Sequence, residues 1–147
     1  IPLHGICTHD AIAAAAELDV EPAAAADEAT ALVATDARRK EIYWATYRVT
    51  DSGVQRISGP AVTKPAELEV ELASTAEVII PDRLAEQLPE KLAALPHRAA
   101  HPTAAALVAA ADLEAEPAPV VPLYLRRPDA VPPKQQQLSA AIPRVEL

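Results

Sequence analysis

The 147-residue sequence contains no phenylalanine and no methionine, and it has one tryptophan, three tyrosines and three glycines. Large apolar volume must therefore come from Leu, Ile and Val, because much of the 50% hydrophobic content is alanine. We expect a single domain whose core is thin for its length. The hydrophobic share nevertheless predicts a globular fold rather than a disordered chain.

Cysteine is almost absent as well. The single cysteine, Cys7, cannot form an internal disulfide, which is typical of a protein in the reducing cytoplasm. No apolar run reaches the length of a membrane span, and no signal peptide pattern opens the chain. Because the chain starts at Ile1 and has no methionine, we expect a piece of a longer cytoplasmic protein that makes no membrane contact.

Positive charge is scarce. Lys and Arg number 13 against 21 Asp and Glu, which gives a net charge of −8. A surface of this sign repels phosphate backbones unless a local basic patch overrides it. We therefore expect no autonomous nucleic-acid binding.

The first half of the chain predicts a helix and an antiparallel meander. Residues 1–7 read as a short strand, and Thr8 is a good N-cap for a helix that runs to about Leu18. A loop follows. β-Branched, aromatic and apolar runs bounded by turn residues then predict three strands, at residues 29–35, 41–50 and 54–57.

The second half alternates between helices and strands. Helices are predicted at residues 64–73, 82–88 and 102–115, and strands at residues 76–81 and 120–127. A meander followed by this alternation is typical of an α/β domain with a mixed sheet flanked by helices. Residues 128–147 are rich in Pro and Gln and predict an extended tail.

Charged residues cluster between the first two predicted strands. We name residues 36–41 the charged turn. One interpretation is a solvated hairpin turn, in which Asp36 accepts backbone N–H groups and Glu41 pairs back with one of the cations. The other is a tip, led by Arg38 and Arg39, that contacts a partner or an anion. Catalysis is not favoured, because the cluster has no nucleophile beside a base and no histidine.

The histidines do not predict a metal site. His97 and His101 have the spacing of two ligands on one helix face, but no glutamate lies between them and no third ligand is evident. Pro102 also argues against a helix there. His4 and His9 flank Cys7 without a second cysteine, so we expect a buried thiol at a strand-to-helix junction.

The last predicted strand ends in a local basic spot. Arg126 and Arg127 follow Tyr124, and arginine pairs well with carboxylates and phosphates. These side chains could meet a partner, or they could pair with acids of the chain such as Glu114 or Glu116.

Three segments resemble elements of the TsaB family, also called YeaZ, in the same order. TDARRKEIYWATY resembles the signature Asp-Ala-Arg-x-x-Glu-(Val/Ile)-Tyr, and VPLYLRRPDA resembles a closing Pro-x-Tyr-Leu-Arg element. IPLHGICTHDAIAAAA resembles the family segment that precedes them. The resemblance spans most of residues 1–127, and its signature residues are Asp36, Glu41, Tyr43 and Trp44.

The resemblance implies an actin-like, ribonuclease-H-like fold of two lobes, with residues 1–127 as the C-terminal lobe. The Gly-rich stretch of the family's first lobe has no counterpart among three scattered glycines, so we expect that lobe to be absent from this chain. After the predicted strand at 76–81, Pro81, Asp82 and Arg83 stand where relatives have a Gly-containing loop. This departure argues against a phosphate-binding loop.

The resemblance also implies an accessory role without catalysis. Such a subunit pairs with the catalytic subunit TsaD and the ATPase TsaE to place N6-threonylcarbamoyl on adenosine 37 of certain tRNAs. We expect no cofactor or metal of its own. The partner-contacting residues are predicted to be Arg38, Arg39, Tyr124, Arg126 and Arg127. Two other classes stay open: a glycoprotease-like hydrolase, and a structural module that forms a homodimer.

Overall fold

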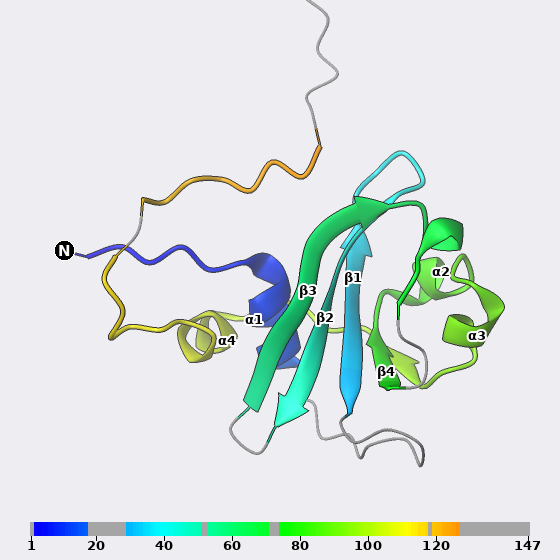
Figure 1. The fold of residues 1–147 in the computed structure, drawn as a ribbon, viewed down its shortest axis with the longest axis horizontal. Coiled ribbons are helices and arrows are strands. Elements are labelled where there is room, and N and C mark those ends of the chain that lie inside the picture. The colour runs from blue at the N-terminus through cyan, green and yellow to red at the C-terminus, as the bar shows by residue number, and fades with distance from the viewer. Residues whose placement is uncertain (1, 18–28, 51–52, 71–73, 118, 127–147) are drawn as a thin grey trace, which may run out of the picture.

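A computed structural model describes residues 2–17, 29–50, 53–70, 74–117 and 119–126. Five strands form one mixed sheet in the order β3-β2-β1-β4-β5 (Figure 1). β1, β2 and β3 pair antiparallel, whereas β4 runs parallel to β1 and β5 runs parallel to β4. The strands are β1 (Thr30–Asp36), β2 (Ile42–Thr50), β3 (Gly53–Thr63), β4 (Thr75–Ile79) and β5 (His97–Arg98).

Helices lie on both faces of the sheet. Figure 1 shows α1 (Thr8–Ala15) and α4 (Ala104–Ala109) on one side, and α2 (Asp82–Ala85) and α3 (Glu90–Ala93) on the other. A short 3-10 turn, η1 (Pro65–Glu67), follows β3. No helix in the described ranges has the length and hydropathy needed to cross a bilayer.

The sheet separates two hydrophobic clusters. Ile42 and Trp44 face the cluster under α2 and α3, whereas Ala45 and Tyr47 face the cluster under α1. This alternation along β2 follows the strand period of two. β1 is buried on both faces, from Ala31 to Ala34, which explains its continuous apolar run.

The antiparallel meander and the mixed α/β sheet are confirmed, but β3 is longer than predicted. It continues to Thr63 rather than ending at Ile57. The pair Gly59-Pro60 resembles a break in the sequence, yet the strand passes through it. A Cβ on Gly59 would lie 2.6 Å from the Trp44 carbonyl oxygen, so glycine permits the close approach of β3 to β2.

Two predictions near the N-terminus are wrong. Residues 2–7 belong to no strand of the sheet. α1 begins at Thr8 with Cys7 in the N-cap position and no side-chain cap, so Thr8 is not the cap residue. Cys7 is only partly buried. The end of the predicted helix at Leu18 and most of the following loop lie outside the described residues.

Two later elements are also corrected. The predicted helix at 64–73 is reduced to η1, and Leu68–Val70 are irregular because Leu68 packs into the core instead of continuing a helix. Residues 120–126 form no strand: Pro119 and Pro122 have no N–H to donate to a ladder. Residues 71–73, Arg127 and the predicted tail at 128–147 lie outside the described ranges.

The remaining elements are shorter than predicted. α4 covers only part of residues 102–115, and it begins after Thr103, whose side chain accepts the Ala106 N–H at 3.1 Å. α2 is one turn long. α3 and β5 are short elements between prolines that the sequence pattern does not predict.

Candidate partner-binding site at the charged turn

The charged turn closes the β1–β2 hairpin. The strands pair as far as Asp36 and Ile42. Beyond this pair, the Ala37 N–H donates to the Glu41 carbonyl at 3.0 Å, and the Glu41 N–H donates to the Arg38 carbonyl at 3.0 Å. The backbone of the turn is therefore fixed by its own hydrogen bonds.

Three consecutive residues of the turn have left-handed backbone conformation. The φ angles of Arg38, Arg39 and Lys40 are +64°, +54° and +62°. For residues with a Cβ this conformation costs roughly 1–2 kcal/mol each. All three side chains are exposed, so they project from the end of the hairpin. Strain of this kind persists only where surrounding contacts hold it in place.

Asp36 supplies the main contacts that hold the turn. Its Oδ1 accepts the Arg38 N–H at 2.7 Å, which confirms its predicted role as a turn acceptor. Its Oδ2 accepts from Arg83 Nη1 at 3.0 Å, a partner contributed by α2. The Arg38 N–H and then the Arg83 guanidinium hold the pKa of Asp36 below its ordinary value.

Glu41 anchors the C-terminal segment, which we define as residues 119–126. Arg126 Nη2 donates to Glu41 Oε2. Arg126 therefore pairs with an acid of its own chain, as one interpretation held, but the acid is Glu41 rather than Glu114 or Glu116. Glu41 correspondingly bonds to Arg126 and not, as predicted, to a cation of its own turn. The local spacing of charges favoured those pairs, but the fold returns the C-terminal segment to the charged turn.

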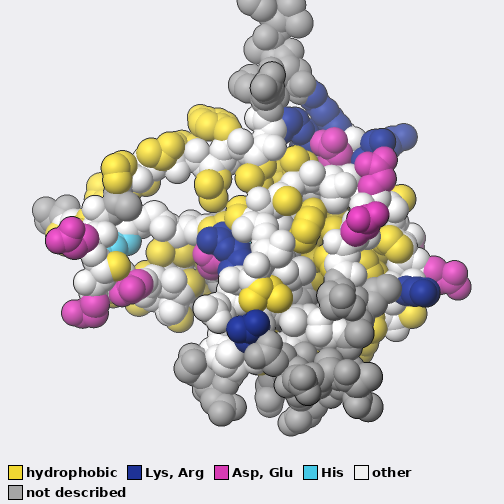
Figure 2. Space-filling view, viewed as in Figure 1, with side chains coloured by type: hydrophobic (Ala, Val, Ile, Leu, Met, Phe, Trp, Pro, Cys, Tyr) yellow, Lys and Arg dark blue, Asp and Glu magenta, His cyan; other side chains and the backbone are white. Residues whose placement is uncertain are grey.

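The predicted partner-contacting residues that the structure describes lie on the charged turn and on the C-terminal segment that Glu41 anchors to it. Arg38 and Arg39 are exposed at the tip, and Arg126 reaches the turn through Glu41. Tyr124 is 80% exposed on the same segment. Arg127 lies outside the described residues. Figure 2 shows Lys and Arg side chains gathered beside Asp and Glu near the charged turn.

The ion pairs formed by Asp36 and Glu41 do not neutralise the positive charge of the charged turn. Asp36 and Glu41 each hold one arginine, Arg83 and Arg126. Arg38 and Lys40 have no ion pair within the part of the chain that the structure describes. In a protein with a net charge of −8, the turn is thus a local cationic surface.

Tyr43 and Trp44 have structural positions behind the turn. The Tyr43 carbonyl accepts from His9 Nε2 at 3.2 Å, and Thr35 Oγ1 lies 3.3 Å from the same nitrogen. Burial is the largest cause that lowers the pKa of His9. Trp44 packs against the core cluster under α2 and α3. These residues fix β2 to α1 and to the core rather than forming a reactive group.

The histidine pair takes no helical arrangement. His97 is exposed in β5, and His101 lies in an irregular segment before α4. This confirms that residues 97–101 are not a helix. In the described ranges, no three His, Cys, Asp or Glu side chains lie close enough together to hold a metal ion.

Arg83 is the site residue that sequence reasoning missed. β4 runs parallel to β1, so the carboxyl ends of both strands lie at the same edge of the sheet. Asp36 ends β1, and Arg83 comes shortly after β4. A prediction that had placed β4 beside β1 would have brought these two residues together.

Comparison with known families decides the assignment. A family model described as TsaD, tRNA N6-adenosine threonylcarbamoyltransferase, matches residues 1–111. The chain belongs to the TsaD family. An uncharacterized protein of Mycobacterium leprae is 43% identical over 134 residues, which are 90% of this chain and 31% of that protein. An uncharacterized protein of Mycobacterium tuberculosis is 41% identical over 133 residues, 90% of this chain and 53% of that protein.

The chain spans between about a third and about half the length of these TsaD-family relatives. Its fold is similar to a Pseudomonas aeruginosa crystal structure described as an uncharacterized protein with similarity to peptidase YeaZ. The TM-score is 0.64 at 21% identity, over 85% of this chain and 59% of that one. This similarity shows that the two chains share a fold, which in this chain is an α/β domain with a mixed five-stranded sheet.

Proposed function

We propose that this chain is the C-terminal lobe of an accessory subunit that helps a TsaD-like enzyme form N6-threonylcarbamoyladenosine at position 37 of tRNA. The match to the TsaD family over residues 1–111 carries the proposal. The accessory subunit would bind its partner and leave catalysis to it. Its place of action would be the cytoplasm, in keeping with the single cysteine.

The contacts at the charged turn support binding rather than catalysis. Both carboxylates are engaged by arginines: Asp36 by Arg83 and Glu41 by Arg126. A general base needs a carboxylate that is free to take a proton, and a lowered pKa opposes that role for Asp36. The engaged carboxylates instead hold the cationic tip in one conformation.

The tip has the chemistry of a contact surface for an acidic partner. Arginine and tyrosine are enriched among the residues that dominate binding energy at protein interfaces. Arg38, Arg39 and Tyr124 are exposed, and the Glu41–Arg126 pair joins the charged turn to the segment that carries Tyr124. We propose that this surface meets a TsaD-like subunit, or the TsaE-like ATPase that works with it.

A first lobe would cover part of the remaining surface. Leu3 and the apolar residues of the C-terminal segment are largely exposed, with Val121 at 72% and Leu123 at 64%. Exposed apolar groups of this size mark interaction surfaces. The relatives have additional length that could supply such a lobe.

Reconstitution tests this proposal. The purified TsaD-like subunit, TsaE-like ATPase, threonylcarbamoyl donor and tRNA are combined with or without the full-length form of this protein. We expect threonylcarbamoyladenosine to form only when the protein is present. Equal product without it, with all other components active, would contradict an accessory role.

A hydrolase remains the second candidate, because the similar Pseudomonas aeruginosa protein is described by likeness to a peptidase. Cleavage of a peptide library by the purified chain would support this alternative. Cleavage should then fall when His9, the buried histidine beside Thr35, is replaced.

A further inference from the structure

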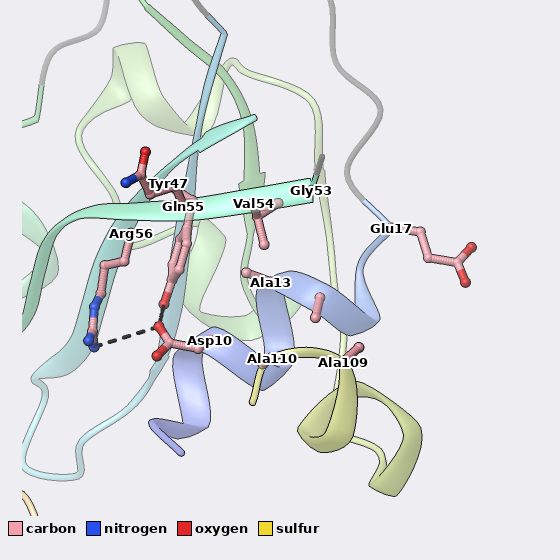
Figure 3. Close-up of a pocket in the computed structure, with 11 residues that line it drawn as sticks. Asp10, Ala13, Glu17, Tyr47, Gly53, Val54, Gln55, Arg56, Ala109 and Ala110 are labelled. Carbon is pink, nitrogen blue, oxygen red and sulfur yellow. Dashed lines mark hydrogen bonds and ion pairs between the residues drawn. The ribbon is translucent and has the colours of Figure 1, made fainter. Parts of the chain in front are cut away.

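A cavity lies away from the charged turn, between α1, α4 and the paired strands β2 and β3 (Figure 3). Its volume is about 510 Å³. This falls within the range of roughly 300–1,000 Å³ that is typical of small-molecule sites. Nothing in the proposed accessory function uses it.

Three polar side chains meet at one wall of this cavity. The Tyr47 hydroxyl donates to Asp10 Oδ1 at 2.8 Å, and Arg56 Nη1 lies 3.6 Å from the same oxygen (Figure 3). Tyr47 is 1% exposed, so its ring is held by the core. Burial, followed by the bond to Asp10, raises the pKa of Tyr47 far above its ordinary value, and the phenol stays a donor.

The charged pair keeps unused bonding capacity. The side chains of Arg56 and Asp10 are 33% and 26% exposed, so both are accessible from the cavity. Within the described residues, Arg56 makes this single long ion pair and no hydrogen bond, and Asp10 Oδ2 accepts none. A guanidinium presents five N–H donors in a plane that matches a carboxylate.

We propose that this cavity binds a free α-amino acid. The ligand's carboxylate accepts from Arg56, and its ammonium group donates to Asp10 Oδ2. One cation and one anion side by side recognise a zwitterion better than either ion alone, because each ligand charge is paired. Tyr47 positions Asp10 and does not contact the ligand's charged groups.

The other walls favour an apolar side chain on the ligand. Most of the remaining lining residues are small or apolar, namely Ala13, Ala14, Val54, Ala109 and Ala110. Glu17 also lines the cavity and repels an acidic side chain. L-Leucine is therefore the first ligand to test, and L-glutamate is the matched poor ligand.

Titration calorimetry with four compounds tests the pairing. L-Leucine is compared with 4-methylpentanoate, which lacks the ammonium, with 3-methylbutylamine, which lacks the carboxylate, and with L-glutamate. Loss of one charged hydrogen-bonded contact should weaken binding by about tenfold or more relative to L-leucine. Absence of any heat or melting shift with millimolar L-leucine would overturn the proposal.

Variants assign the binding to this cavity. Arg56→Gln should weaken L-leucine by about tenfold or more and leave the amine unchanged. Asp10→Asn should weaken L-leucine similarly and leave 4-methylpentanoate unchanged, and its amide oxygen can still accept from Tyr47. Arg83→Gln, at the charged turn, is the matched control and should bind L-leucine normally. Melting curves verify that each variant folds. Unchanged L-leucine affinity in both Arg56→Gln and Asp10→Asn would overturn the site.

Discussion

Asp36 is the residue on which the conformation of the charged turn depends. It accepts one backbone N–H and one guanidinium N–H, and the neighbouring residues adopt left-handed conformations. A short polar side chain with two acceptor oxygens suits this position, because glutamate would carry its oxygens too far from the Arg38 N–H. The signature residue therefore has a structural reason to be an aspartate.

The first prediction concerns Asp36 and acid stability. Its folded pKa lies below the ordinary value of 3.8, so its contribution to stability is present above that value and is lost as the pH falls through the lower folded pKa. Asp36→Asn should remove this part of the acid dependence while keeping an acceptor for Arg38. Urea denaturation at several acidic pH values measures it. The same pH slope in both proteins would contradict the assignment.

His9 predicts a dependence in a different pH range. Burial lowers its folded pKa below the ordinary 6.5, so the unfolded chain takes up the proton first. Stability should be full above 6.5 and should decline as the pH falls from there toward the folded pKa. His9→Gln should flatten the unfolding free energy between about pH 7 and pH 5. The other three histidines stay in both proteins, so a difference between the slopes belongs to His9.

At the scale of elements, β3 depends on one close approach to β2. A Cβ on Gly59 would meet the Trp44 carbonyl oxygen at 2.6 Å and the Ala45 Cα at 2.9 Å. Gly53, also with positive φ, has open space where its Cβ would be. Gly59→Ala should therefore destabilise by about 1–3 kcal/mol more than Gly53→Ala in urea denaturation. Equal losses would mean that the strands can separate locally without cost.

The C-terminal segment is held to the hairpin by a charge pair that a swap experiment can isolate. Glu41→Arg and Arg126→Glu should each release the segment, because like charges then face each other. The double variant restores opposite charges. We expect limited proteolysis within residues 119–126 to be faster in each single variant and to recover in the double. If proteolysis of the double variant stays as fast as in the single variants, the Glu41–Arg126 pair does not hold the C-terminal segment.

Local pattern predicted some elements and failed at others for definable reasons. The β-branched and aromatic run located β2. Its Ile42 and Trp44 face one core cluster and its Tyr47 faces the other, because this central strand has a core on both sides. Residues 64–73 have good helix formers, yet Leu68 is drawn into the core and the helix stops at one turn. Tertiary packing outweighed propensity there.

The sequence predicted only part of the candidate site. Asp36 and the exposed arginines could be read from the turn itself, since a hairpin tip is a local structure. The pairing of Asp36 with Arg83 and of Glu41 with Arg126 joins residues 47 and 85 positions apart. Such pairs depend on the order of the strands in the sheet and on the path of the C-terminal segment. Neither can be predicted from the local pattern of one sequence.

At the scale of the whole molecule, an acidic chain carries a cationic tip at the charged turn. Its net charge of −8 repels nucleic acid at long range, whereas the charged turn can attract an acidic protein surface over a Debye length of about 8–10 Å. Exposed apolar residues along the C-terminal segment add area beside this tip (Figure 2). Both features are ones that the proposed partner binding would use. Light scattering would detect the alternative, a homodimer.

The most direct test of the account is titration calorimetry of a TsaD-like subunit into the full-length protein and its charge-reversal variants. Arg38→Glu with Arg39→Glu should weaken binding about tenfold or more at low salt, with a nearly unchanged melting temperature. Lys91→Glu, an exposed charge reversal on α3, is the control and should bind normally. If the double variant binds as tightly as the parent, the charged turn is not the partner surface. If the parent does not bind at all, the accessory function itself is contradicted.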